Sequence, residues 1–198
     1  MSEKVTIKYT LSWNEYGQLV EEVWQKLRAE LTARSIKIDA VIMVIREGCF
    51  TALPLAYKLN SYKVIPIQYK YFLNDGSNEL KQIAKIPELT YSLPEAPIFL
   101  LCDTWPCGGK TKDLVIAEFK QKWPKAKFVF ASIFEDDSVK HEDILCAVSA
   151  VDVGYGFTTT HPIFTKAGLA TVFEALLPWQ NAGEEIAGPN MTNWDYQV

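Results

Sequence analysis

The sequence predicts an α/β protein with a doubly wound, mainly parallel sheet and a small C-terminal cap. Nearly continuous apolar runs, which are typical of strands buried on both faces, alternate with segments of helical periodicity. A length of 198 residues is enough for one substantial core and short for two. We therefore expect a single domain over residues 1–198, in which residues from about 154 to 198 form the cap.

The first predicted helix runs from about Trp13 to Thr32. Ser12 and Glu15 have the spacing of a capping box, in which two side chains satisfy backbone N–H groups at a helix start. Apolar residues then follow at helical spacing, namely Tyr16, Leu19, Val20, Val23, Trp24, Leu27 and Leu31.

Four apolar runs predict the strands of the sheet, and two helical patterns predict crossovers. The strands are expected at Ile38–Ile45, Val64–Ile67, Ile98–Cys102 and Phe128–Phe134, and the helices at Ala52–Leu59 and Lys112–Lys122. In such sheets, ligands bind beyond the carboxyl ends of the strands. Three segments, 45–51, 68–85 and 103–111, are therefore the candidates for a site.

The composition argues against several classes of partner. The net charge is -4 and basic residues are not clustered, so we expect no nucleic-acid partner. We expect no membrane partner, because no apolar run approaches the roughly 18 residues of a membrane span. The first thirty residues lack a signal pattern and the four cysteines form no C-x-x-C pair, which favours a cytoplasmic protein with free thiols. Aromatic residues of the tail, such as Trp179 and Trp194, favour a homodimer.

The segment after the third strand has the features of a phosphate-binding loop. The strand ends at Asp103, and the chain then passes through Gly108 and Gly109 into a helix with Thr111 near its start. Free N–H groups at a helix start, approached through glycines, form an anion cradle. An ordinary strand-to-helix turn would explain the glycines equally well. A Walker A loop is disfavoured, because Thr104 stands where its first glycine belongs.

This segment resembles the phosphoribosyl pyrophosphate motif of the type I phosphoribosyltransferases, which has two acids, two apolar residues and a small-Thr-Gly-x-Thr turn. Asp103 matches the first acid, Thr104 replaces the second, and Gly109 and Thr111 match the turn. The resemblance implies that Asp103 and Thr104 act on the ribose hydroxyls, with Asp103 also a ligand of Mg²⁺. It further implies that the 5-phosphate binds to Cys107, Gly108, Gly109, Lys110 and Thr111.

The segment after the first strand resembles the pyrophosphate loop of the same family, an apolar strand followed by Arg-Gly-Gly. Arg46 and Gly48 match, and Glu47 replaces the first glycine. The resemblance implies that all three bind pyrophosphate, that Arg46 is catalytic, and that a cis peptide lies beside Arg46. Residues 69–80 stand where the family has its mobile catalytic loop, from which Lys70 or a tyrosine would contact pyrophosphate. A plain surface hairpin is an equally good interpretation.

Both ends of the chain resemble xanthine-guanine and hypoxanthine phosphoribosyltransferases. The similar segments are Leu11–Glu15 and Leu177–Gln180. The resemblance implies that Phe173 and Trp179 contact the base, although Phe173 is equally suited to a core position.

The implied activity is transfer of ribose 5-phosphate from phosphoribosyl pyrophosphate to a nucleobase, with a purine favoured, Mg²⁺ as cofactor and pyrophosphate as product. The replacements at Glu47, Thr104 and Cys107 favour an alternative, a non-catalytic or regulatory protein of the same fold that binds a phosphoribosyl compound or nucleotide.

Overall fold

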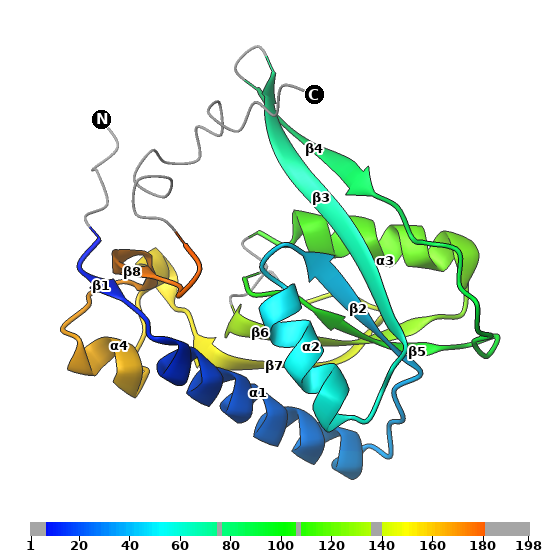
Figure 1. Ribbon diagram of the computed structural model, residues 1–198, viewed down its shortest axis with the longest axis horizontal. Helices are drawn as coiled ribbons and strands as arrows, with labels where there is room; N and C mark the ends of the chain where they lie inside the picture. The colour runs from blue at the N-terminus through cyan, green and yellow to red at the C-terminus, as the bar shows by residue number, and fades with distance from the viewer. Residues whose placement is uncertain (1–6, 75–76, 106–107, 136–139, 181–198) are drawn as a thin grey trace. The chain divides into compact units, whose positions relative to one another are not determined.

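The structure is a computed structural model that describes residues 7–74, 77–105, 108–135 and 140–180 (Figure 1). The α-helices are Trp13–Ala33 (α1), Cys49–Lys58 (α2), Lys110–Lys122 (α3) and Pro162–Lys166 (α4). The strands are Tyr9–Thr10 (β1), Ala40–Ile45 (β2), Val64–Asn74 (β3), Ser77–Ala84 (β4), Ile98–Cys102 (β5), Lys127–Glu135 (β6), Ile144–Asp152 (β7) and Ala175–Leu176 (β8). Cys107 and Trp194, which the sequence singled out, lie outside the described residues.

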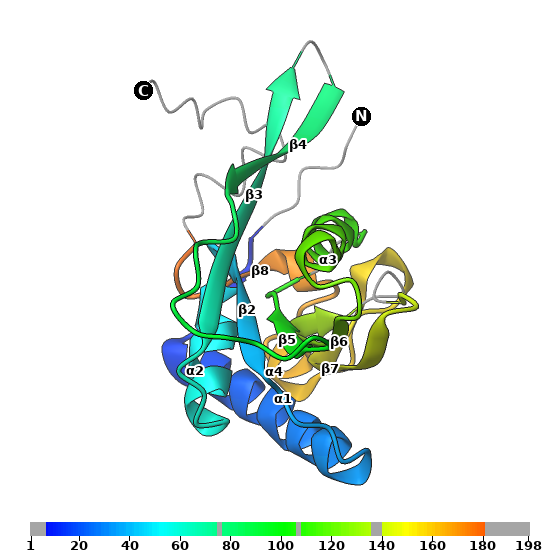
Figure 2. The same cartoon turned by 90° about the vertical axis from the view of Figure 1, so that its right-hand side faces the viewer.

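The central sheet has six strands in the order β4-β3-β2-β5-β6-β7. The strands from β3 to β7 in that order pair in parallel. The crossover helices α2 and α3 lie on opposite faces of the sheet, as Figures 1 and 2 show together. The prediction of a doubly wound, mainly parallel sheet is therefore confirmed.

The core follows from the alternation of side chains along the central strands. Ile42 and Val44 of β2 point to the face covered by α3, where they join one large apolar cluster with Phe99 and Phe119. The rings of Phe99 and Phe119 meet edge to face at 5.0 Å. Each such buried side chain contributes roughly 1.5–3 kcal/mol of hydrophobic stabilisation, so this cluster holds α3 against the sheet.

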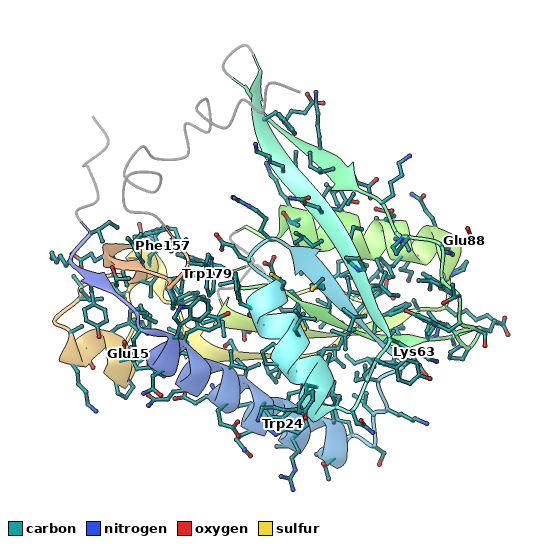
Figure 3. The ribbon with its side chains drawn as sticks, in the orientation of Figure 1. Glu15, Trp24, Lys63, Glu88, Phe157 and Trp179 are labelled. Carbon is teal, nitrogen blue, oxygen red and sulfur yellow. The ribbon has the colours of Figure 1, made fainter. Side chains whose placement is uncertain are left out.

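Helix α1 starts and ends almost where the sequence predicts. The Ser12 N–H donates to the Glu15 carboxylate over 2.8 Å, and the Glu15 N–H donates to the Ser12 hydroxyl over 3.2 Å, so the capping box is present. Farther along, the Lys26 ammonium donates to the carbonyl of Ser149 in β7 over 2.7 Å. The Lys58 ammonium of α2 lies 5.8 Å from the ring centroid of Trp24, which Figure 3 labels on α1.

The polar stretch after the second predicted strand is a hairpin at the sheet edge. Strand β3 continues to Asn74 instead of ending near Ile67, and β4 follows after two residues. A connection this short joins only antiparallel strands. The predicted strand was too short because an edge hairpin keeps polar residues that a buried strand excludes. The described residues of segment 69–80 thus belong to a hairpin, and its role as the catalytic loop stays a prediction.

The described residues belong to two compact units. The larger unit lies within residues 19–69 and 82–152 and contains most of the sheet. The smaller unit lies within residues 1–18, 70–81 and 153–198. In it, β1 pairs in parallel with β8, which the sequence did not indicate because each strand has two residues. Among the described helices, none combines the length and apolar character that crossing a bilayer requires.

Candidate functional site

The loop at the carboxyl end of β2 turns directly into α2. The peptide bond between Ile45 and Arg46 is cis, as the resemblance implied. Helix α2 begins at Cys49, three residues before the predicted start, with Gly48 as its N-cap. The first N–H groups of a helix have no acceptor within the helix, so this loop carries backbone donors immediately after the exposed Arg46.

Gly48 packs against the end of the neighbouring strand β5. A Cβ atom at Gly48 would lie 2.5 Å from the carbonyl oxygen of Val44, 2.8 Å from that of Cys102 and 3.2 Å from the Cα atom of Asp103. Only glycine allows backbones to approach this closely. The two loops that the sequence singled out, after β2 and after β5, are thus in contact inside the larger unit.

Asp103 is the acid at the junction of these loops. Burial raises the pKa of its carboxyl group to about 7, and the negative charge of the nearby Glu47 adds to the rise, whereas the N–H groups of Thr104 and Trp105 lower it. The Thr104 N–H donates to the Asp103 carboxylate over 2.8 Å. A carboxylate held in this way, with an acid beside it, suits a ligand that brings hydroxyl donors or a cation.

Thr104 follows Asp103 but turns into the protein interior. Its side chain is 0% exposed. Its carbonyl accepts the N–H groups of Ile133 and Phe134 in β6. Its buried hydroxyl has no hydrogen-bond partner among the described residues. The contact of Thr104 with ribose therefore stays a prediction, and the described conformation buries the hydroxyl that would make it.

The turn before α3 has the backbone that the phosphate-loop interpretation requires. Gly108 and Gly109 both have positive φ, 76° and 71°, which residues with a Cβ atom rarely adopt. Gly109 is the N-cap of α3, and among the described residues no side chain caps this helix start. Thr111 is half-buried and Lys110 is exposed. The glycines and the helix start thus present backbone N–H groups, as an anion cradle needs.

Lys112 is a residue that the sequence analysis did not select. It is only 2% exposed, and its ammonium lies 3.1 Å from the carboxylate of Asp113. The motif Gly-Gly-Lys-Thr-Lys contains two lysines, and the phase of α3 decides which of them points inward. The helix was predicted to begin at Lys112 instead of Lys110, so the sequence could not tell which lysine is buried.

The predicted base contacts lie in the smaller unit, in which each aromatic ring packs against others. The Phe173 ring lies 4.4 Å from that of Phe157. The Trp179 ring lies 4.7 Å from Tyr16 and 5.8 Å from Trp13, at the start of α1 (Figure 3). These packing contacts give both residues a structural role, and their contact with a base stays a prediction.

Lys70, the predicted pyrophosphate contact of the third segment, also belongs to the smaller unit. It lies on β3, and its ammonium is 5.3 Å from the ring centroid of Phe72. At its base the hairpin is anchored to α3, because the Tyr69 hydroxyl donates to Glu118 over 2.7 Å. The role of Lys70 stays a prediction.

The predicted Mg²⁺ site has to be judged from its donor chemistry. Within the described part of the chain, no group of three or more His, Cys, Asp or Glu side chains is arranged to hold a metal ion. Mg²⁺ commonly needs only one or two protein carboxylates, with ligand phosphates and water completing the shell. Asp103 supplies such a carboxylate at the junction of the loops, so the residues present fit the ion.

Comparisons with known proteins identify the fold. No protein-family model matches the chain, and no curated protein does. Among solved structures, a purine phosphoribosyltransferase from Pyrococcus horikoshii is 18% identical with a TM-score of 0.58, covering 87% of this chain and 93% of that one. The xanthine-guanine-hypoxanthine phosphoribosyltransferase of Helicobacter pylori is 20% identical with a TM-score of 0.58, covering 74% and 88%.

A hypothetical protein from Neisseria gonorrhoeae with bound ppGpp is similar over a longer stretch. It is 18% identical with a TM-score of 0.63, and the match covers 94% of this chain and 96% of that one. Together with the strand order, these similarities show that the chain has the type I phosphoribosyltransferase fold.

Proposed function

We propose that this protein transfers the ribose 5-phosphate of phosphoribosyl pyrophosphate to a nucleobase, with a purine favoured, and releases pyrophosphate. The observation that supports this most is the packing of Gly48 against Cys102 and Asp103. It joins an anion-binding loop to an acid at the carboxyl ends of adjacent parallel strands, where ligands of such sheets bind. The protein would then be a pentosyltransferase.

Backbone groups would bind both the 5-phosphate and the pyrophosphate of phosphoribosyl pyrophosphate. Gly108 to Thr111 would hold the 5-phosphate, because left-handed glycines and a helix start direct N–H groups at one point. Arg46 and the N–H groups of Glu47 and Gly48 would hold the pyrophosphate. Phosphate binding remote from the reacting carbon would serve to orient the ribose.

At the ribose, Asp103 would accept hydrogen bonds from the 2- and 3-hydroxyls, as a carboxylate with free lone pairs can. Charge that develops on the leaving pyrophosphate would be stabilised by the positive charge of Arg46. Asp103 would hold Mg²⁺, which when bound neutralises phosphate charge.

Base recognition would fall to aromatic faces of the smaller unit. Phe173 is half-buried beside Phe157, and Trp179 is half-buried beside Tyr16. A planar ring gives contact area and tolerates different bases. We propose these two residues as base contacts, and Lys70 as a contact of the pyrophosphate.

We also propose that the protein acts as a cytoplasmic homodimer. Cys49, Cys102 and Cys146 carry free thiols, which suits a reducing compartment. Leu53 and Tyr57, one turn apart on α2, are 51% and 88% exposed and would be covered in a dimer. Light scattering coupled to size-exclusion chromatography would test the dimer.

The decisive experiment measures pyrophosphate release from phosphoribosyl pyrophosphate and Mg²⁺ with a panel of purine and pyrimidine bases. We expect turnover with at least one purine, and loss of turnover by about 100-fold or more in Asp103→Asn if the carboxylate orients the ribose. Glu88→Gln, an exposed position beyond β4 labelled in Figure 3, is the control. No release with any base would contradict the proposal.

A second candidate is a non-catalytic protein that binds a nucleotide or phosphoribosyl compound in this site. Two observations favour it: Thr104 buries its hydroxyl where the resemblance expects an acid, and the similar Neisseria protein carries ppGpp. Calorimetric titration with ppGpp and with phosphoribosyl pyrophosphate separates the candidates. Tight binding of ppGpp without turnover for any base would establish the second one.

A further inference from the structure

The site contains one carboxylate that the resemblance does not account for. Glu47 stands in the pyrophosphate loop where a glycine is usual, and Thr104 stands where the second acid is usual. One acid is thus missing from the loop after β5, and one has been gained in the loop after β2. The two loops are neighbours in the structure, so the gain and the loss concern the same site.

The packing of Gly48 defines how close the gained acid is. Gly48 approaches Cys102 and Asp103 so tightly that a Cβ atom would be 3.2 Å from the Asp103 Cα. Glu47, the residue before Gly48, is half-buried. The chain segments that carry Glu47 and Asp103 therefore meet at the ends of β2 and β5.

Thr104 cannot easily replace a carboxylate in the described conformation. Its side chain is fully buried, and its carbonyl is bonded to two N–H groups of β6, which hold the residue in place. A neutral hydroxyl also supplies no negative charge for a cation. The second negative charge of the site has to come from elsewhere.

We propose that Glu47 supplies this second carboxylate, so that a divalent cation is held between Glu47, Asp103 and the pyrophosphate of the ligand. This inference rests on the proposed function for the location of the pyrophosphate. Binding of pyrophosphate should then depend on the cation. Without the cation, the negative charge of Glu47 repels pyrophosphate, whereas Arg46 and the backbone N–H groups attract it.

The test is calorimetric titration of inorganic pyrophosphate into the full-length protein, in EDTA and in Mg²⁺. For the unaltered protein we expect Mg²⁺ to tighten pyrophosphate binding by about 10-fold or more, because residues that support a bound metal commonly change metal affinity by at least that factor. In Glu47→Gln we expect binding in EDTA to tighten by about two- to fivefold as the repulsion disappears, and most of the Mg²⁺ effect to be lost.

Two control variants and two further measurements make the result specific. Glu88→Gln removes an exposed acid remote from these loops and should behave as the unaltered protein. Glu47→Asp keeps the charge and should retain part of the Mg²⁺ effect. Mn²⁺ binding in the presence of pyrophosphate, followed by electron paramagnetic resonance, should weaken in Glu47→Gln, and thermal melting confirms that each variant is folded.

An unchanged Mg²⁺ effect in folded Glu47→Gln would overturn the inference and leave the proposed transferase intact. Conversely, Mg²⁺-dependent pyrophosphate binding that requires Glu47, in a protein without turnover for any base, would support the inference and contradict the proposed function. Absence of pyrophosphate binding in both EDTA and Mg²⁺ would overturn both.

Discussion

At the amino ends of its strands the parallel sheet pairs opposite charges, whereas at their carboxyl ends it brings two acids and closely packed backbone together. The amino end is represented by Asp143, just before β7. Its carboxylate lies 2.5 Å from the ammonium of Lys120 and 2.7 Å from that of Lys127. Asp39, just before β2, likewise accepts the N–H of Ile98 over 2.8 Å.

The contacts at the carboxyl ends of the strands are of a different kind. Glu47 raises the pKa of Asp103 instead of pairing with it, Gly48 is compressed against β5, and the Thr104 hydroxyl is buried without a partner among the described residues. Natural proteins depart from local rules chiefly at functional sites. The difference indicates that the amino end stabilises the fold, while the carboxyl end retains groups that become favourable when a ligand is bound.

The largest effect is expected for Gly48→Ala, which breaks the carboxyl end. The new methyl group would meet the carbonyl oxygens of Val44 and Cys102, and backbone atoms of a central sheet cannot move aside cheaply. We expect the free energy of unfolding to fall by about 2–3 kcal/mol and pyrophosphate binding to be lost. Urea denaturation and calorimetry measure the two effects.

Gly17→Ala is the matched control for this substitution. Gly17 lies within α1, and a Cβ atom there has no neighbour within 4 Å. Alanine should raise the free energy of unfolding by about 0.5–1 kcal/mol, because glycine weakens a helix interior. If both variants were equally stable, the close approach at Gly48 would not constrain the fold.

Asp143→Asn tests the amino end. Because Asp143 is buried between two lysines, its loss should lower the free energy of unfolding by about 1–2 kcal/mol. Pyrophosphate binding should be unchanged, since Asp143 lies at the other end of the sheet. A variant of unaltered stability, or one that lost binding while folded, would contradict the division of roles between the two ends.

The stabilisation that Asp143 contributes should depend on pH. Hydrogen bonds from Lys120 and then Lys127 lower the pKa of Asp143 in the folded protein. The unfolded chain therefore takes up the proton first as the pH falls, so the stabilisation is complete above about pH 4, the unfolded value. It is lost as the pH falls through the folded pKa. Urea titrations at pH 7 and in the acid range should show the Asp143→Asn difference shrinking with acid.

Apart from the control Gly17→Ala, the smallest change in the free energy of unfolding is expected for Thr104→Val. Valine keeps the shape of the side chain and removes a buried hydroxyl that has no described partner. We expect the free energy of unfolding to rise by about 1 kcal/mol, while Thr104→Ser, which keeps the hydroxyl and loses a methyl group, should be destabilised. If Thr104→Val instead weakened binding of phosphoribosyl pyrophosphate about tenfold or more, the hydroxyl would contact the ribose after all.

The parallel strands β2, β3, β5 and β6 were predictable because their apolar runs are local in sequence, whereas the parallel strand β7 was not predicted. Strand Ile98–Cys102 and the helix from Trp13 were predicted within a residue. The hairpin was harder, since its polar residues suit a loop and an edge strand alike. The strand pair β1–β8 was not predictable, because two-residue strands leave no periodic pattern.

By itself the sequence determined the chain order of α1, β2, α2, β3, β5, α3 and β6 and the positions of the glycines and acids, because hydrophobic period, capping residues and backbone freedom are properties of neighbouring residues. Tertiary structure alone decided that Gly48 touches Asp103, that the charge of Glu47 acts on that acid, that Thr104 faces inward and that Lys112 is buried. These facts depend on which strands are adjacent and on the phase of each helix, and packing between distant segments sets both.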